Sequence, residues 1–122
     1  MKPTILVVDD DVNLTKLYEA AFSSRGYRVI VANDGETALS LAEKEKPDLV
    51  LLDIMMPAIH GLHVLDILKA TPESKDAKII MLTALSDDAT KEKALEYGAT
   101  DYIVKSESNM AEILDRVAKA LS

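Results

Sequence analysis

The chain has 122 residues, of which 48% are apolar, so it is long enough to form one domain around a hydrophobic core of its own. It contains no cysteine, which excludes a disulfide framework and cysteine-ligated metals, and its net charge of −7 argues against nonspecific binding of nucleic acid. The apolar run near the N-terminus, residues 5–8, is too short for a signal peptide or a membrane span. We therefore expect a cytoplasmic protein that contacts no membrane and makes no direct contact with nucleic acid.

Short apolar runs alternate along the chain with segments of helical periodicity. The runs are typical of strands buried on both faces, and the segments between them repeat apolar residues at the spacing of one helix face. The predicted strands are residues 5–8, 28–32, 49–52, 78–82 and 101–104, and the predicted helices carry residues 14–22, 38–42, 62–68, 87–97 and 110–121. This alternation predicts an α/β fold, a doubly wound five-stranded parallel sheet with five helices on its two faces.

No repeat, low-complexity tract or linker divides the chain, so we expect residues 1–122 to form a single domain with no output domain after it. One predicted helix differs from the others. The segment 87–97 has a narrow apolar stripe, consisting of Ala89, Ala94, Leu95 and Tyr97. A helix with so few apolar positions is weakly held by packing, which makes it a candidate for a mobile or partner-facing element.

Polar residues follow four of the predicted strands, and they are Asp9, Asp10, Asp11, Asp53, Thr83 and Lys105. Because the carboxyl ends of parallel strands lie at one edge of a sheet, we expect these side chains to converge. By itself, Asp53 could be a nucleophile, a metal ligand or a loop cap. Several neighbouring carboxylates favour a hard divalent cation such as Mg²⁺, and a lysine and a threonine beside them could hold a phosphoryl group.

The segments ILVVDDD, PDLVLLDIMMP, MLTA and GATDYIVK resemble the response-regulator receiver domain of two-component signalling, the CheY-like superfamily. The resemblance covers the whole chain, with the segments in the right order and spacing. It implies a flavodoxin-like sheet with the strand order 2-1-3-4-5. It also implies a signalling phosphoacceptor rather than an enzyme with other substrates, with a histidine kinase or a histidine phosphotransfer protein as its partner.

The resemblance implies a role for each residue of the motifs. Asp53 would accept the phosphoryl group. Asp9 and Asp10, together with Asp53 and the backbone carbonyl of Met55, would hold Mg²⁺ or Mn²⁺. The ions are expected to favour the ionised carboxylate and to shield the incoming phosphoryl oxygens from its charge.

Three further residues match the family's phosphoryl-binding and switch positions. Thr83 would contact the phosphoryl group, Lys105 would pair with it, and Tyr102 would be the switch aromatic. We expect movement of Thr83 to make room for Tyr102 to turn inward, which would bias the helix over 87–97 and the last strand and helix toward partner binding.

The sequence departs from the family pattern at two positions. Ser106 follows Lys105 where the family usually has proline, often after a cis peptide bond. A Lys-Ser peptide loses about 2.5 to 4 kcal/mol in the cis form, so we expect this loop to be trans or looser. His60 precedes Gly61 where the family favours Asp or Asn, and a turn with positive φ there would suit histidine poorly.

Other classes of protein remain to be weighed. An aspartate-nucleophile phosphatase of the haloacid dehalogenase type needs a second Asp two residues after the nucleophile, where this chain has Met55. A flavodoxin-like electron carrier needs a phosphate-binding loop after the first strand, where the three acids would repel a flavin phosphate. A receiver-like module that binds partners without being phosphorylated stays open.

Two further groups of residues carry weaker signals. His60 and His63 stand three apart with no other histidine, so we expect surface or loop roles rather than a metal site. The last strand and helix carry a partial match to the charge pattern of dimerising transcriptional regulators, which predicts a phosphorylation-dependent homodimer. The residues of that pattern are Asp101, Glu112, Asp115 and Arg116.

Overall fold

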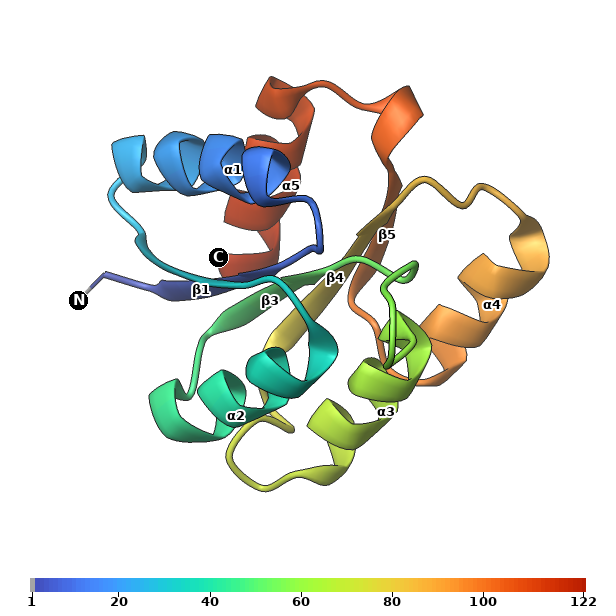
Figure 1. Cartoon of the computed structure of the whole chain (residues 1–122). Coiled ribbons are helices and arrows are strands. Elements are labelled where there is room, and N and C mark those ends of the chain that lie inside the picture. The colour runs from blue at the N-terminus through green and yellow to red at the C-terminus, as the bar shows by residue number, and fades with distance from the viewer. Residues whose placement is uncertain (1) are drawn as a thin grey trace.

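The computed structural model describes residues 2–122 (Figure 1). Five parallel strands form one sheet in the order β2-β1-β3-β4-β5, which confirms the predicted α/β fold and the strand order that the resemblance implied. The elements are β1 (Thr4–Val8), α1 (Val12–Ser24), β2 (Arg28–Ala32), α2 (Gly35–Glu45), β3 (Leu49–Leu52), α3 (Gly61–Ala70), β4 (Lys78–Thr83), α4 (Asp88–Glu96), β5 (Asp101–Val104), the 3₁₀ helix η1 (Lys105–Glu107) and α5 (Met110–Leu121).

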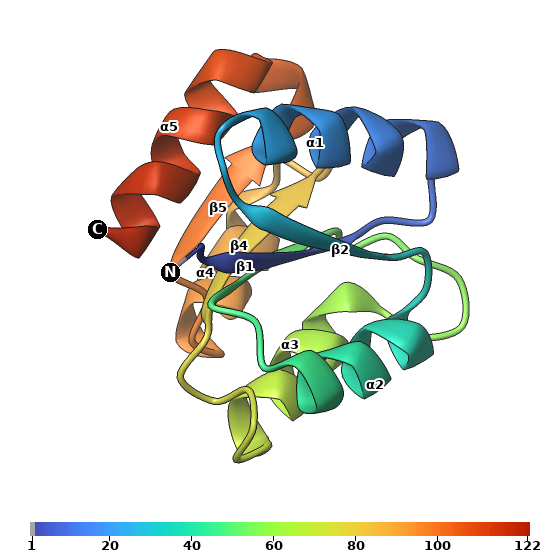
Figure 2. The same ribbon diagram turned by 90° about the vertical axis from the view of Figure 1, so that its left-hand side faces the viewer.

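The helices cover both faces of the sheet (Figure 2). Helices α1 and α5 lie on one face, while α2, α3 and α4 lie on the other. Alternate residues of a strand point to opposite faces, so Ile5 and Val7 of β1 join the core under α1 and α5, and Leu6 and Val8 join the core under α2 and α3. This two-sided burial explains why the central strands are continuous apolar runs.

Strand register brings the ends of the central strands to one level. Val8 at the end of β1 is paired with Ala32 of β2 and with Leu52 of β3. The next residues continue the ladder, because the N–H of Asp53 donates to the Val8 carbonyl at 3.0 Å and the N–H of Asp9 donates to the Ala32 carbonyl at 3.2 Å. The backbones of Asp9 and Asp53 therefore lie side by side at this edge of the sheet, as the parallel topology predicted.

The helix over 87–97 is slightly shorter than expected. Asp87 is the N-cap of α4 and Tyr97 is its C-cap, so the helix itself runs from Asp88 to Glu96. Ala94 is the buried residue of α4, which agrees with the narrow apolar stripe in the sequence. The last helix begins as expected, with Asn109 as N-cap in a capping box with Glu112.

The loop between β3 and α3 corrects one expectation. His60 has a φ of −65°, so the prediction that its turn requires a positive φ is wrong. The left-handed residue of this loop is Ala58, with a φ of 69°. His60 instead caps α3, because its Nδ1 accepts the N–H of Leu62 at 3.2 Å. A histidine can replace the Asp or Asn of the family pattern here because it supplies the same capping acceptor.

The peptide bond between Lys105 and Ser106 is trans, and both residues belong to η1. None of the helices within residues 2–122 combines the length and the apolar character needed to cross a membrane.

Candidate functional site

Three aspartates gather at the carboxyl edge of the sheet. One carboxylate oxygen from each of Asp9, Asp10 and Asp53 lies within 4.8 Å of the others. Asp9 and Asp53 are buried, with 3% and 5% of their surface exposed, while Asp10 opens to solvent. Oxygen ligands that converge from two strands, with one side open to water, suit the coordination of a hard divalent cation.

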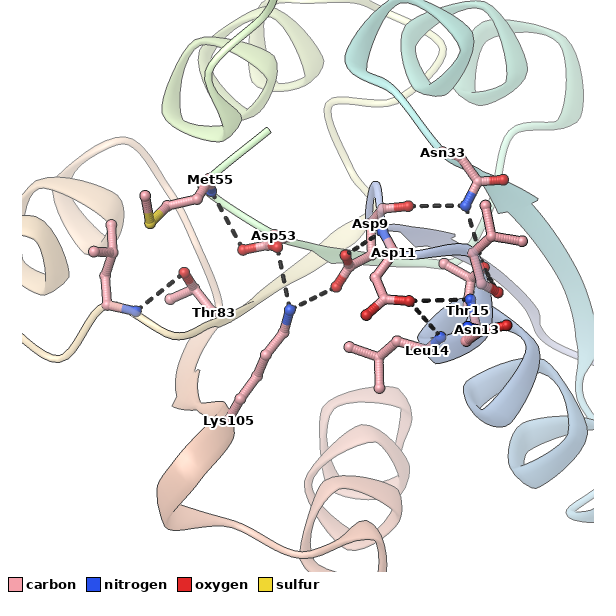
Figure 3. Close-up of polar contacts among 12 residues, drawn as sticks. Asp9, Asp11, Asn13, Leu14, Thr15, Asn33, Asp53, Met55, Thr83 and Lys105 are labelled. Carbon is pink, nitrogen blue, oxygen red and sulfur yellow. Dashed lines mark hydrogen bonds and ion pairs between the residues drawn. The ribbon is translucent and has the colours of Figure 1, made fainter. Parts of the chain in front are cut away.

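Lys105 joins the two buried carboxylates (Figure 3). Its Nζ lies 2.7 Å from Oδ2 of Asp9 and 3.1 Å from Oδ2 of Asp53. Burial disfavours the charged amine, but the hydrogen bond to Asp9 and the negative charges of Asp53 and Asp9 outweigh it and raise the pKa of Lys105. Three carboxylates against one ammonium leave a charge of −2, which one divalent cation would neutralise.

The loop after β3 folds back on Asp53 and Ile54 through hydrogen bonds and one close backbone contact. Oδ1 of Asp53 accepts the N–H of Met55 at 3.3 Å, which places the Met55 backbone beside the carboxylate. Farther along the loop, the N–H of Gly61 donates to the Ile54 carbonyl at 2.8 Å. A Cβ atom on Gly61 would lie 2.2 Å from the Asp53 carbonyl oxygen, so only glycine fits this approach.

Thr83 and Tyr102 both hold Leu85, which the sequence did not single out. Thr83 is fully buried, and its Oγ1 accepts the N–H of Leu85 at 3.3 Å. The Tyr102 hydroxyl donates to the Leu85 carbonyl at 2.8 Å. The ring of Tyr102 already lies inward in this structure, with 5% of the residue exposed, while Thr83 still holds Leu85. The expectation that the ring turns inward only after Thr83 moves is therefore wrong. Its burial, with the charges of Asp87 and Asp53, raises the pKa of the phenol.

Asp11, the third acid after β1, does not join the cluster. Its Oδ1 accepts the N–H groups of Asn13 and Leu14 at 3.0 and 3.1 Å, so it is the N-cap of α1. Its own N–H donates to Oδ1 of Asp9 at 3.0 Å. Of the three consecutive acids, Asp9 and Asp10 thus belong to the cluster and Asp11 caps α1. The direction of each side chain depends on the residue at which α1 starts.

Asn33 is a second residue that the sequence reasoning missed. Its Nδ2 donates to the Asp9 carbonyl at 2.9 Å and to Oγ1 of Thr15 at 3.2 Å. Asn33 lies just after β2, the one strand end for which no polar residue was assigned to the site. The strand order that the resemblance implied, with β2 beside β1, was the available signal, but the register that places residue 33 beside residue 9 is seen only in the structure.

The two histidines and the charged residues of the last helix lie away from the acids. His60, the N-cap of α3, and His63, within α3, are both exposed, and within residues 2–122 they join no group of three potential metal ligands. Asp101 and Arg116 form an ion pair within the chain, in which Nε of Arg116 lies 2.8 Å from Oδ2 of Asp101. Asp115 is exposed.

Comparisons with known proteins agree with this geometry. Residues 5–118 match the family model described as the response regulator receiver domain. The chain is 45% identical to a probable transcriptional regulator, ycf27, of Porphyridium aerugineum, an alignment that covers 99% of this chain and 52% of that protein. The chain thus spans about half the length of this curated relative.

Two solved structures show the same fold. The chemotaxis protein CheY4 of Vibrio cholerae has a TM-score of 0.93 at 27% identity, with 99% of this chain and 100% of that chain covered. The BeF3-activated N-terminal receiver domain of RstA from Klebsiella pneumoniae has a TM-score of 0.89 at 35% identity, with 97% of each chain covered.

Proposed function

Because this chain belongs to the response regulator receiver domains of two-component regulatory systems, we propose that Asp53 accepts a phosphoryl group from a histidine kinase or a histidine phosphotransfer protein. The observation that carries the proposal is the contact of Lys105 Nζ with both Asp9 and Asp53. It supports a site in which the carboxylate of Asp53 can act as the acceptor and the ammonium group of Lys105 already lies where it can pair with a phosphoryl oxygen.

In the proposed transfer, a carboxylate oxygen of Asp53 bonds to phosphorus while the bond from phosphorus to the donor's imidazole nitrogen breaks. The imidazole leaves with the electron pair of that bond. Lys105 then pairs with a phosphoryl oxygen, and the Thr83 hydroxyl donates to another. Asp9, Asp10, Asp53 and the backbone carbonyl of Met55 would hold Mg²⁺ or Mn²⁺, which when bound would neutralise charge on the phosphoryl oxygens.

The proposed switch passes through Leu85. If Thr83 turns its hydroxyl toward the phosphoryl group, its bond to the N–H of Leu85 is lost. The Leu85 carbonyl, which holds the Tyr102 hydroxyl, is then free to move with the start of α4. We propose that this change alters the face formed by α4, β5 and α5 for partner binding or for homodimerisation, with Glu112 and Asp115 on its α5 side.

We also propose that residues 1–122 form a single receiver domain that works in the cytoplasm and transfers no group to other substrates. The relative of about twice this length is called a transcriptional regulator. Any contact of a longer protein with nucleic acid would then come from outside these residues, because this domain carries a net charge of −7.

Intact mass measurement after incubation with Mg²⁺ and acetyl phosphate tests the acceptor. We expect the wild type to gain one phosphoryl mass, Asp53→Asn to gain none, and Asp66→Asn, an exposed aspartate on α3, to behave as the wild type. Chelation of Mg²⁺ is expected to abolish the adduct. A wild type without an adduct would overturn the proposal and favour a module that binds without phosphorylation.

Sedimentation velocity tests the homodimer. We expect beryllofluoride, a mimic of the phosphoryl group, to raise the sedimentation coefficient of the wild type and to leave that of Asp53→Asn unchanged. A wild type that stays monomeric in beryllofluoride at high protein concentration would rule out the dimer and leave the acceptor role intact.

A further inference from the structure

Asp9 is held at every polar atom. Its N–H donates to the Ala32 carbonyl, and its carbonyl accepts from Nδ2 of Asn33 at 2.9 Å. Its Oδ1 accepts the N–H of Asp11, and its Oδ2 accepts from Lys105. The end of β2 therefore binds both backbone groups of Asp9. The Ala32 carbonyl accepts the N–H, and the Asn33 side chain donates to the carbonyl.

The Asn33 amide uses both of its hydrogens. Besides the Asp9 carbonyl, it donates to Oγ1 of Thr15, a residue that is 1% exposed. The Thr15 hydroxyl in turn donates to the Val12 carbonyl at 3.0 Å. One side chain thus connects the end of β1, the end of β2 and the first turn of α1 (Figure 3).

The Asp9 carbonyl belongs to the same planar peptide group as the N–H of Asp10. A hydrogen bond that fixes this carbonyl therefore fixes the orientation of the peptide plane that leads into Asp10. Asp10 is exposed and supplies one of the three gathered carboxylate oxygens, so its direction depends on that plane.

We propose that Asn33 is a positioning residue for the divalent-cation site: it sets the peptide between Asp9 and Asp10 so that the Asp10 carboxylate meets those of Asp9 and Asp53. The inference rests on the proposed function, since it concerns the cation that the acidic cluster would hold. Asn33 is neutral and contacts a backbone carbonyl, so Asn33→Ala removes a donor and leaves the charge of the site unchanged.

Titration of Mn²⁺ followed by electron paramagnetic resonance measures this affinity directly, because the signal of the free hydrated ion falls as the protein binds it. We expect Asn33→Ala to weaken Mn²⁺ binding about tenfold, the lower end of the effect of residues that orient metal ligands. Asn13→Ala replaces an exposed asparagine on α1 and is expected to bind as the wild type.

Thr15→Val separates positioning from general stability. It removes a buried hydroxyl but leaves the bond from Asn33 to Asp9 in place, so we expect lower stability in urea with Mn²⁺ affinity within twofold of the wild type. If Thr15→Val weakened Mn²⁺ binding as much as Asn33→Ala does, the role of Asn33 would be structural only, and the proposal would fail.

Asn33→Asp is a second variant, which keeps the size of the side chain and removes its donors. We expect it to bind Mn²⁺ more weakly in spite of its added negative charge; equal or tighter binding would count against the proposal. A wild type that binds no Mn²⁺ would overturn the metal site of the proposed function itself. A wild type that binds, with Asn33→Ala binding equally well, would overturn the positioning role alone.

Discussion

Lys105 and Asp9 are 96 residues apart in the chain, yet Nζ of the lysine lies 2.7 Å from Oδ2 of the aspartate. Asp53 shares the same ammonium group. Two buried carboxylates would repel each other strongly in a medium of low dielectric constant. The lysine is therefore a stabilising counter-ion as well as a candidate for phosphoryl binding, and the stability of the unphosphorylated protein reports the first of these effects alone.

Lys105→Ala is expected to lower the free energy of unfolding by about 3 kcal/mol in the presence of a chelator, since loss of one partner leaves buried carboxylates uncompensated. The pKa of Lys105 is raised in the folded protein, so this stabilisation is complete below the ordinary lysine value of 10.5 and is lost as pH rises through the raised value. Urea unfolding at pH 7 measures it. Lys16→Ala, at an exposed position of α1, is the control and should cost little.

Gly61→Ala is expected to destabilise the protein by about 3 kcal/mol and to reduce phosphorylation of Asp53. The added methyl would lie 2.2 Å from the Asp53 carbonyl oxygen, and the backbone at Asp53, directly after β3, would have to shift. Gly26→Ala is the matched control. Gly26 has a φ of 89° but no neighbour within 4 Å of an added Cβ, so a loss of only about 1 kcal/mol is expected, with phosphorylation unchanged. Equal effects of the two substitutions would contradict the close-approach explanation.

Ala58→Gly is expected to stabilise the protein by about 0.5 to 1 kcal/mol. Ala58 has a φ of 69°, which glycine adopts without the steric cost that a Cβ incurs, although glycine also loses more freedom on folding. Ala118→Gly, at an exposed position within α5, should instead lose about 1 kcal/mol. Thermal unfolding of the two variants checks the opposite signs.

Asp87 makes the stability of α4 depend on pH. Its Oδ2 accepts from the Thr90 hydroxyl at 2.6 Å and from the Thr90 N–H at 3.0 Å, and these bonds lower the pKa of the Asp87 carboxyl. A lowered pKa gives stability that is present above the ordinary value of 3.8 and is lost as pH falls through the folded-state value.

The wild type is therefore expected to be more stable than Asp87→Ala at pH 6, with the difference shrinking as the pH falls below about 4. Asp87→Asn keeps a capping oxygen that does not titrate, so the amount by which it is more stable than Asp87→Ala should be the same at pH 6 and below about pH 4. Circular dichroism during urea unfolding at each pH provides the comparison. A constant difference between wild type and Asp87→Ala would exclude this role.

The sequence predicted the elements of this fold well for a physical reason that the structure makes plain. The strands of the sheet's centre are buried on both faces, so their sequences are short unbroken apolar runs that alternate with segments of helical periodicity. The polar residues at their carboxyl ends then converge through parallel topology alone. Asp53 and Lys105 could be placed together in this way without knowledge of any side-chain conformation.

What escaped prediction depends on register and local direction. Asn33 reaches Asp9 because β1 and β2 pair in one register, which no pattern within either segment specifies. Asp11 turns to cap α1 while Asp10 stays with the cluster, and this division follows from the residue at which the helix starts. The positive φ of the loop after β3 falls on Ala58 rather than on His60, because His60 is needed in extended conformation as the cap of α3.

Helix α4 contributes one buried side chain, Ala94, to the core, whereas the residues of β3 are buried throughout. Amide hydrogens of α4 are accordingly expected to exchange with solvent long before those of β3. Asp53, the proposed acceptor, follows directly after β3, whereas the face proposed to respond to its phosphorylation includes α4. The proposed switch would thereby join a durable chemical centre to a surface whose rearrangement demands little free energy.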